Sequence, residues 1–240
     1  MRRAVRRRTS QRRVPAPRSP ESIERLIERQ PWDRLAASLA AAGAEVATTT
    51  TRLRGFLHGL VEWNRGASNL VARGDEPRLV ERHLVESLTP ASWMAESGAR
   101  RWLDFGSGAG LPAIPLALAG IGSTWTLVES RRSKVLFMLK YLQDSGLQNI
   151  EVIHDRLENV VEARPAGEFD GFTSRATMTL SPTLVMAAPL VKSGGVAFLW
   201  KGSGRDEELR ADPRWMDDWE HDGTRVIGEG PTAVMRFIRK

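Results

Sequence analysis

A glycine-rich segment at residues 104–110, with the sequence DFGSGAG, carries the clearest chemical pattern in the chain. It follows a short apolar run and precedes the apolar segment 111–118. Glycines at such a place let the backbone turn tightly and pass close to a bound ligand. The order G-x-G-x-G differs from the G-x-G-x-x-G order that brings a pyrophosphate to a helix N-terminus. The pattern therefore favours a ligand without a pyrophosphate, and the alternative is a tight turn that joins a strand to a helix.

Acidic residues stand at the ends of the neighbouring apolar runs. Glu129 lies 19 residues beyond Gly110. A carboxylate there can accept hydrogen bonds from both hydroxyls of a ribose; alternatively, Glu129 is a surface charge that starts a helix. Asp104 either holds the glycine loop or faces an ammonium group of the ligand through water. The third apolar run is followed by the tetrapeptide 155–158, where an adenine can lie against Leu157 and meet a polar group. These positions predict a site for a ligand that contains a nucleoside.

After Arg101, short apolar runs alternate with glycine turns and helical segments, which predicts βαβ units and a parallel sheet. The expected strands are Arg101–Phe105, Thr124–Glu129, Asn149–His154, Phe169–Ser174, Val196–Trp200, Thr224–Ile227 and Ala233–Ile238. The last two are joined by Gly228–Pro231, which is short enough for an antiparallel hairpin. Five parallel strands followed by such a hairpin are typical of class I methyltransferases, whereas a dinucleotide-binding fold usually continues with parallel strands. We therefore predict an α/β, doubly wound, Rossmann-like class I methyltransferase fold with a mostly parallel seven-stranded sheet.

The first hundred residues predict a helical cap. The apolar spacing from Glu21 to about Gly43 suits a helix that is interrupted near Pro31. A second helix is expected over 50–64 and a third over 76–95. The buried side of the third is expected to consist of Leu79, Leu84, Val85 and Leu88. The predicted domains are a tail at 1–20, a helical cap at 21–98 and a ligand-binding domain at 99–240.

Residues 1–20 hold eight arginines and no acidic residue, whereas the whole chain of 240 residues carries a formal charge of +6. The remaining residues hold 27 basic and 29 acidic side chains, so they are close to neutral together. The tail lacks the apolar residues that would offset the entropy of ordering, and we predict that it is disordered. Three interpretations stay open: a solvated extension or mis-assigned start, a grip on RNA phosphates that releases counterions, and an organellar transit peptide, against which the scarcity of leucine argues.

The chain contains no cysteine. This excludes disulfides, thiolate metal sites and a cysteine nucleophile, including the covalent activation that methylation of pyrimidine carbon 5 requires. The Pro-Pro pair common in enzymes that methylate exocyclic adenine amines is also missing. We expect no bound metal. No uncharged apolar stretch approaches the ~20 residues of a membrane-spanning helix. The N-terminus lacks the apolar segment of a secretory signal, so we expect a cytoplasmic protein that does not bind membranes.

Both halves of the chain contain short segments that together form one ordered pattern. They are Trp63-Asn64, Asn69-Leu70, Arg82-His83, Glu86-Ser87, 104–118, Glu129-Ser130, Arg156-Leu157-Glu158, Phe169-Asp170-Gly171, Ser174-Arg175-Ala176, Gly194-Gly195 and Lys201-Gly202. With these segments in this order, the chain from about Thr50 to Lys240 resembles the RsmG (GidB) family, whose members methylate N7 of a guanosine in the 530 loop of bacterial 16S rRNA. The resemblance implies S-adenosyl-L-methionine as the cofactor and 16S rRNA or the small ribosomal subunit as the partner; we expect a monomer.

The resemblance also implies which residues form the site. The cofactor site includes Gly106, Leu111, Leu157, Glu158 and Arg175, and the strand-end pattern adds Asp104, Ser107, Gly108, Gly110 and Glu129. Arg175 is the candidate catalytic residue: it positions the methionine carboxylate or the guanine O6 edge, or alternatively forms a structural ion pair with Asp104 or Glu158. The candidate RNA contacts are Asn64, Arg82, His83, Arg131, Lys134 and Lys201. A structural histidine and solvated surface cations are the alternatives for these last positions.

The chain departs from the family pattern at four positions. Ala109 and Ala113 stand where proline and glycine are common, which bears on the shape of the glycine loop. Val71 and Glu86 stand where threonine and aspartate are usual, which bears on the RNA side. Guanine N7 has an in-plane lone pair and loses no proton on methylation, so none of these changes removes a required group. The alternative functions are a class I methyltransferase for a small molecule or protein, a nucleotide-binding oxidoreductase, and a non-catalytic RNA-binding relative.

Overall fold

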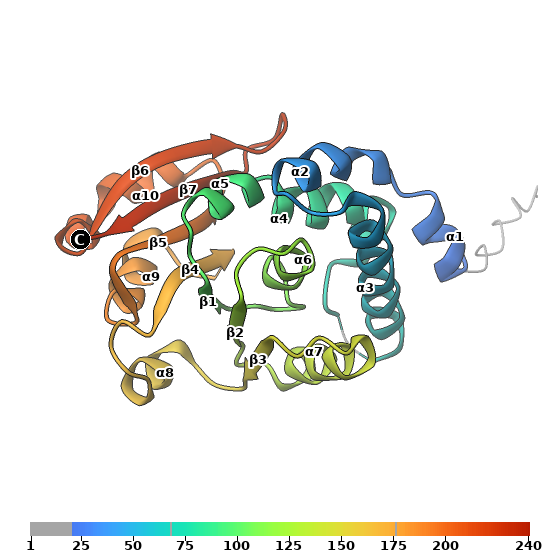
Figure 1. The fold of residues 1–240 in the computed structure, drawn as a ribbon, viewed down its shortest axis with the longest axis horizontal. Coiled ribbons are helices and arrows are strands. Elements are labelled where there is room, and N and C mark those ends of the chain that lie inside the picture. Colours follow the sequence, from blue (N-terminus) through green and yellow to red (C-terminus); the bar gives the residue numbers. More distant parts are fainter. Residues whose placement is uncertain (1–20, 68, 176) are drawn as a thin grey trace, which may run out of the picture.

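The computed structural model describes residues 21–67, 69–175 and 177–240, so the disorder predicted for 1–20 lies outside the described residues. Its centre is a seven-stranded sheet with helices on both faces (Figure 1). The strands are β1 Arg101–Phe105, β2 Thr124–Val128, β3 Ile150–Ile153, β4 Phe169–Arg175, β5 Val191–Lys201, β6 Trp219–Val226 and β7 Ala233–Arg239. Their order is β3-β2-β1-β4-β5-β7-β6. The first five strands run parallel and β7 pairs antiparallel with both β5 and β6, which confirms the predicted fold class.

Along the chain, one group of helices precedes the first strand, and a second group lies between the strands. Before the sheet lie α1 Ile23–Glu28, η1 Trp32–Leu35, α2 Ala36–Ala41, α3 Val46–Gly66, η2 Arg73–Arg78, η3 Val80–Val85, α4 Glu86–Leu88 and α5 Ala91–Glu96. Within the sheet region lie α6 Ala113–Leu118, α7 Arg132–Ser145, α8 Leu157–Ala163, α9 Leu180–Ala187, α10 Arg205–Ala211 and η4 Pro213–Asp217. Helices α8 and α9 cover one face of the sheet, and α6 and α7 cover the other together with the N-terminal helices (Figure 1).

The N-terminal helices share a hydrophobic core with one face of the sheet. Helix α3 turns an apolar side inward, and Phe56 on it is fully buried. The Phe56 ring meets the edge of Tyr141 on α7 with ring centroids 5.1 Å apart and also packs near Phe137. One continuous cluster of buried side chains runs from Leu26 through this contact to Trp102 on β1. Burial of this surface fixes the cap relative to the sheet, so cap residues can form one side of a site at the strand ends.

The prediction of a single helix over 76–95 is wrong. The segment forms a 3-10 turn, a π-helical stretch at Val80–Val85 and two short α-helices. Two prolines, Pro77 and Pro90, lack the backbone donor that a continuous helix needs. The Gln30 side chain also takes part, because its amide donates to the Glu76 carbonyl and its oxygen accepts from the Val80 N–H. The four residues predicted on its inner side are nevertheless fully or partly buried.

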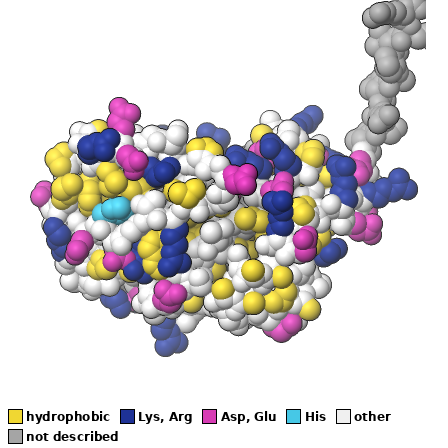
Figure 2. Space-filling view, turned by 90° about the horizontal axis from the view of Figure 1, so that it is seen from above, with side chains coloured by type: hydrophobic (Ala, Val, Ile, Leu, Met, Phe, Trp, Pro, Cys, Tyr) yellow, Lys and Arg dark blue, Asp and Glu magenta, His cyan; other side chains and the backbone are white. Residues whose placement is uncertain are grey.

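Charges of both signs cover the face that lies over β6, α5 and α2. On this face Lys and Arg side chains are scattered among Asp and Glu side chains, with hydrophobic and uncharged surface between them (Figure 2). Such mixing agrees with the near-neutral composition of residues 21–240. Among the described residues, none of the helices combines the length and apolar character needed to cross a membrane.

Candidate active site

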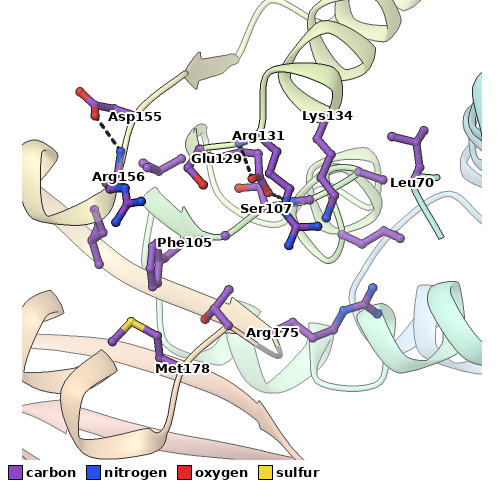
Figure 3. Close-up of a pocket in the computed structure, with 18 of the residues that line it drawn as sticks. Leu70, Phe105, Ser107, Glu129, Arg131, Lys134, Asp155, Arg156, Arg175 and Met178 are labelled. Carbon is purple, nitrogen blue, oxygen red and sulfur yellow. Dashed lines mark hydrogen bonds between the residues drawn. The ribbon is translucent and has the colours of Figure 1, made fainter. Parts of the chain in front are cut away.

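A cavity of about 640 Å³ opens at the carboxyl ends of β1, β2, β3 and β4 (Figure 3). In open α/β sheets this edge is where ligands bind, because the loops after successive strands meet there. Of the predicted site residues, the cavity is lined by Gly106, Ser107, Gly108, Leu111, Glu129, Leu157, Glu158, Arg175, His83, Arg131 and Lys134. Both the predicted cofactor side and part of the predicted RNA side therefore face one space.

The other predicted residues lie behind this lining. Asp104 is fully buried below it, and a Cβ built on Gly110 would lie 2.3 Å from Ile114 Cδ1. Asn64 is buried, and its side-chain oxygen accepts from the N–H groups of Leu70 and Val71 at 2.7 and 3.2 Å. These two hydrogen bonds hold in place Leu70 and Val71, the cap residues that line the cavity.

Arg82 and Lys201 also lie outside the lining. Arg82 is exposed and pairs with Glu86 at 3.0 Å. Lys201 is 9% exposed, and its ammonium lies 2.8 Å from the Glu208 carboxylate. Contact of either side chain with RNA stays a prediction.

The cavity has further lining residues that were not among the predicted site residues. Leu70 and Val71 come from the cap, and Thr177 and Met178 follow β4. Two signals were available: Asn69-Leu70 belongs to the family resemblance, and Thr177 and Met178 stand directly beyond Arg175 in the chain. Neither signal says that the two segments face each other, since that depends on how the cap packs.

The glycine loop is shaped by its backbone contacts. Gly106 and Ser107 both donate their N–H groups to the Val128 carbonyl, at 2.9 and 3.1 Å, which ties the loop to β2. Gly106 has φ of +68°, and a Cβ built on it would lie 1.9 Å from Thr177 Cγ2. Only glycine fits such a place without strain. The loop and the segment after β4 are therefore in direct contact.

Glu129 is the carboxylate at the end of β2, and it is 6% exposed. One carboxylate oxygen accepts the Gly108 N–H at 2.9 Å, and the other accepts the Arg131 N–H at 2.8 Å. A carboxylate has about four lone-pair sites, so two bonds leave further acceptor capacity on the side of the cavity. The backbone thus holds Glu129 in one orientation, with its oxygens available to a donor such as a hydroxyl.

Asp104 and Arg175 lie on neighbouring strands; Asp104 is fully buried, and the Arg175 side chain is 17% exposed. Thr173 Oγ1 donates to Asp104 Oδ1 at 2.6 Å, while the buried Oδ2 has no hydrogen-bond partner among the described residues. Burial raises the pKa of Asp104 to about 6, and the hydrogen bond from Thr173 opposes this. Burial likewise lowers the pKa of Arg175, whose buried Nη1 makes no hydrogen bond with described residues. The nearest carboxylate to that Nη1 belongs to Glu86 of the cap, at 3.8 Å, and not to the predicted partners Asp104 or Glu158.

His83 lies across the cavity from the sheet and is buried. Burial, together with the charge of Arg175, lowers the pKa of His83 to about 4, so the ring is neutral near pH 7. Neither ring nitrogen hydrogen-bonds to a described residue, and Nε2 lies 3.7 Å from Asp75 Oδ2. Burial raises the pKa of Glu86, and the charge of Arg82 opposes this. The cap therefore places a neutral ring and a carboxylate near Arg175.

Residues 49–223 match the family model described as GidB, rRNA small subunit methyltransferase G. The chain belongs to the GidB family. It is 35% identical over 175 residues to the ribosomal RNA small subunit methyltransferase G of Stutzerimonas stutzeri, which covers 73% of this chain and 78% of that protein. It is 32% identical over 228 residues to the protein of the same name from Sorangium cellulosum, with 94% and 95% covered. Membership of the GidB family supports an rRNA methyltransferase and confirms the resemblance drawn from the ordered segments.

Solved structures support the fold of this GidB chain. The yhhF protein of Escherichia coli, described as a candidate methyltransferase, aligns with a TM-score of 0.54 at 16% identity, covering 65% of this chain and 85% of that one. The PH0226 protein from Pyrococcus horikoshii aligns with a TM-score of 0.54 at 13% identity, covering 75% and 99%. At such identities the likeness concerns the fold alone, and it agrees with the class I methyltransferase fold predicted from the sequence.

Proposed function

We propose that this protein binds S-adenosyl-L-methionine in the cavity and transfers its methyl group to N7 of a guanosine in the 530 loop of 16S rRNA. The observation that carries the proposal is the composition of the cavity in a GidB-family chain. One side holds the glycine loop and Glu129, and the other holds Arg175 and residues of the cap. A cofactor and an acceptor base can meet only where two such sides face one space.

The residues present fit this cofactor. The fixed carboxylate of Glu129 suits the two hydroxyls of a ribose, because it accepts only two backbone bonds in the structure. Leu157 is fully buried in the apolar wall on this side, and Glu158 beside it lines the cavity as a polar group that suits the adenine. Asp104 Oδ2 is a buried oxygen without a partner among the described residues, which suits the ammonium end of the methionine part through water. The loop 106–111 would enclose that end.

The chemistry needs little beyond alignment. The bound cofactor supplies a methyl group on a positively charged sulfur. In the transfer, guanine N7 forms the new bond to carbon with its lone pair, the carbon–sulfur bond breaks, and that electron pair remains on sulfur. No proton leaves N7, so the neutral His83 is not required as a base. The protein contributes by holding both partners in line and by excluding water.

Arg175 is the residue that we assign to orient the acceptor or the methionine carboxylate. Its buried Nη1 has no hydrogen-bond partner among the described residues, although the guanidinium remains charged in proteins. Burying a donor without a partner is costly. A carboxylate or the O6 of guanine would supply the missing acceptor, so the contact would form when the cavity fills.

Arg131 and Lys134 are proposed to contact RNA phosphates. Both extend from the beginning of α7 toward the cavity (Figure 3). Cations at the rim of a site attract the phosphate backbone without reading its sequence. This side of the cavity would thus hold the RNA strand while the target base enters between Arg175 and the cap.

The decisive experiment is methyl transfer from labelled S-adenosyl-L-methionine to small ribosomal subunits that lack their natural methylations. The product is mapped by chemical cleavage at N7-methylguanosine. A single labelled guanosine in the 530 loop is the expected result. Binding of the cofactor without transfer to these subunits would contradict the proposed acceptor and point to a small molecule or protein instead.

A further inference from the structure

Lys201 and Glu208 form a partly buried link behind the wall of the cavity. Lys201 ends β5, and its Nζ donates to the Met178 carbonyl at 2.6 Å. The same Nζ lies 2.8 Å from Glu208 Oε2, which also accepts the Leu180 N–H at 2.7 Å. A single carboxylate oxygen therefore joins the ammonium to the beginning of α9. The link ties β5 and α10 to the chain between β4 and α9.

The tied segment is part of the cavity wall. Thr177 and Met178 line the cavity, and Arg175 ends the strand just before them. Thr177 also lies against Gly106, where an added Cβ would come within 1.9 Å of its methyl carbon. Its hydroxyl is 2.5 Å from that of Ser174. A displacement of Met178 would therefore also displace its neighbour Thr177, which contacts both the glycine loop and Ser174 near the end of β4.

A buried ammonium needs partners, and here both partners belong to, or contact, the same segment. A buried ion pair is by itself a weak source of stability, because apolar residues can often replace it without loss. What this pair supplies is a fixed distance between β5 and the segment after β4. The geometry of the wall depends on that distance.

We propose that Lys201 and Glu208 are positioning residues for methyl transfer. They act through the Met178 carbonyl and the Leu180 N–H, and they set the place of Thr177 and Met178 against the glycine loop. The inference rests on the proposed function for its catalytic consequence. It differs from a direct contact of Lys201 with RNA, since the ammonium points to protein partners.

The test uses the full chain and four variants. Lys201→Met removes the ammonium but keeps an unbranched side chain, and Glu208→Ala removes the shared acceptor. Lys201→Arg keeps the charge and the donors. Arg214→Met is the matched control, because it breaks an exposed pair with Asp212, 2.6 Å apart, on the neighbouring η4.

Four quantities are measured for each variant: amide hydrogen exchange of a peptide covering 177–184, the affinity for S-adenosylhomocysteine by calorimetry, and both kcat and KM with small subunits. For Lys201→Met and Glu208→Ala we expect faster exchange of that peptide. We also expect a loss of about 10- to 100-fold in kcat and cofactor affinity, as for a displacement of ~1 Å. KM for the subunits and its salt dependence should stay near the wild-type values, Lys201→Arg should recover part of kcat, and Arg214→Met should match the wild type.

Several outcomes would overturn the inference. Unchanged exchange of the 177–184 peptide in both Lys201→Met and Glu208→Ala would show that the pair does not hold the segment. A change limited to KM for the subunits, with a smaller salt slope, would make Lys201 a direct RNA contact. Absence of transfer by the wild type refutes the proposed function, whereas the exchange and cofactor measurements still decide whether the pair positions the wall.

Discussion

Replacing Glu129 with glutamine should weaken cofactor binding through the ribose. In the structure the carboxylate accepts two backbone N–H groups, so it is fixed before any ligand arrives. A hydrogen bond to a charged acceptor contributes about 1.5–3 kcal/mol. Loss of one such bond to a ribose hydroxyl therefore corresponds to a decrease in affinity of about 10- to 150-fold.

The variant also changes the loop, because glutamine has only one acceptor oxygen for the N–H groups of Gly108 and Arg131. A thermodynamic cycle separates the two effects. Calorimetry measures S-adenosylhomocysteine and its 2′-deoxyribose analogue with the wild type and with Glu129→Gln. If Glu129 binds the ribose, the analogue loses affinity in the wild type but little further in the variant. Glu162→Gln, an exposed carboxylate on α8, serves as the control.

The result that would refute the reasoning is additivity. If removing the hydroxyl and replacing Glu129 each cost the same with and without the other change, the two groups do not interact. In that case Glu129 acts only by holding the loop. The melting temperature of the apo variant then gives the size of that structural contribution.

Four further predictions concern Arg175, Asp104, the cations at the cavity rim and the N-terminal tail. Arg175→Gln should lower kcat about 10- to 150-fold, as expected for loss of a charged hydrogen bond, with the melting temperature reported alongside; an unchanged kcat would leave the residue only its contact with Glu86. Asp104 is buried with its pKa raised to about 6 from 3.8, so its protonated form stabilises the fold below pH 4 and this contribution is lost as pH rises through 6. Asp104→Asn should therefore stabilise the apo protein by about 2–3 kcal/mol above pH 6 and by little below pH 4 in denaturant unfolding, and a difference that does not change with pH would contradict this. Replacing Arg131 or Lys134 with glutamine should reduce the slope of log affinity for RNA against log salt by about 0.7. Deletion of residues 1–20 should also reduce this slope while leaving cofactor affinity unchanged. For each change, an unchanged slope would exclude contact of the altered residues with RNA phosphates.

The side of the cavity that we propose for the cofactor was predictable because its signals are local. The strand predicted over Arg101–Phe105 is observed with the same bounds. Glycines and a carboxylate at consecutive strand ends meet at one sheet edge whatever the rest of the chain does. The sequence pattern therefore located both the glycine loop and Glu129 before any packing was known.

Other elements depended on packing that the pattern does not contain. Strand β6 begins at Trp219, five residues before the predicted start, because it is an edge strand whose polar residues look like a loop. It pairs with β7 through a register shift between His221 and Gly223. The break-up of the helix expected over 76–95 likewise needs Gln30, a residue more than 40 positions away. Contacts of this range leave no periodic trace in the sequence.

The same distinction separates the two halves of the site. The proposed cofactor half is built by short segments between residues 104 and 158 that follow the ends of β1, β2 and β3. The proposed acceptor half is assembled from distant parts, because the cap reaches Arg175 on β4 through Glu86 at 3.8 Å. A substitution in the buried contact between α3 and α7 can therefore move the acceptor side while the glycine loop stays tied to β2. Acceptor specificity should consequently respond to the packing of the cap, and cofactor affinity to the strand ends.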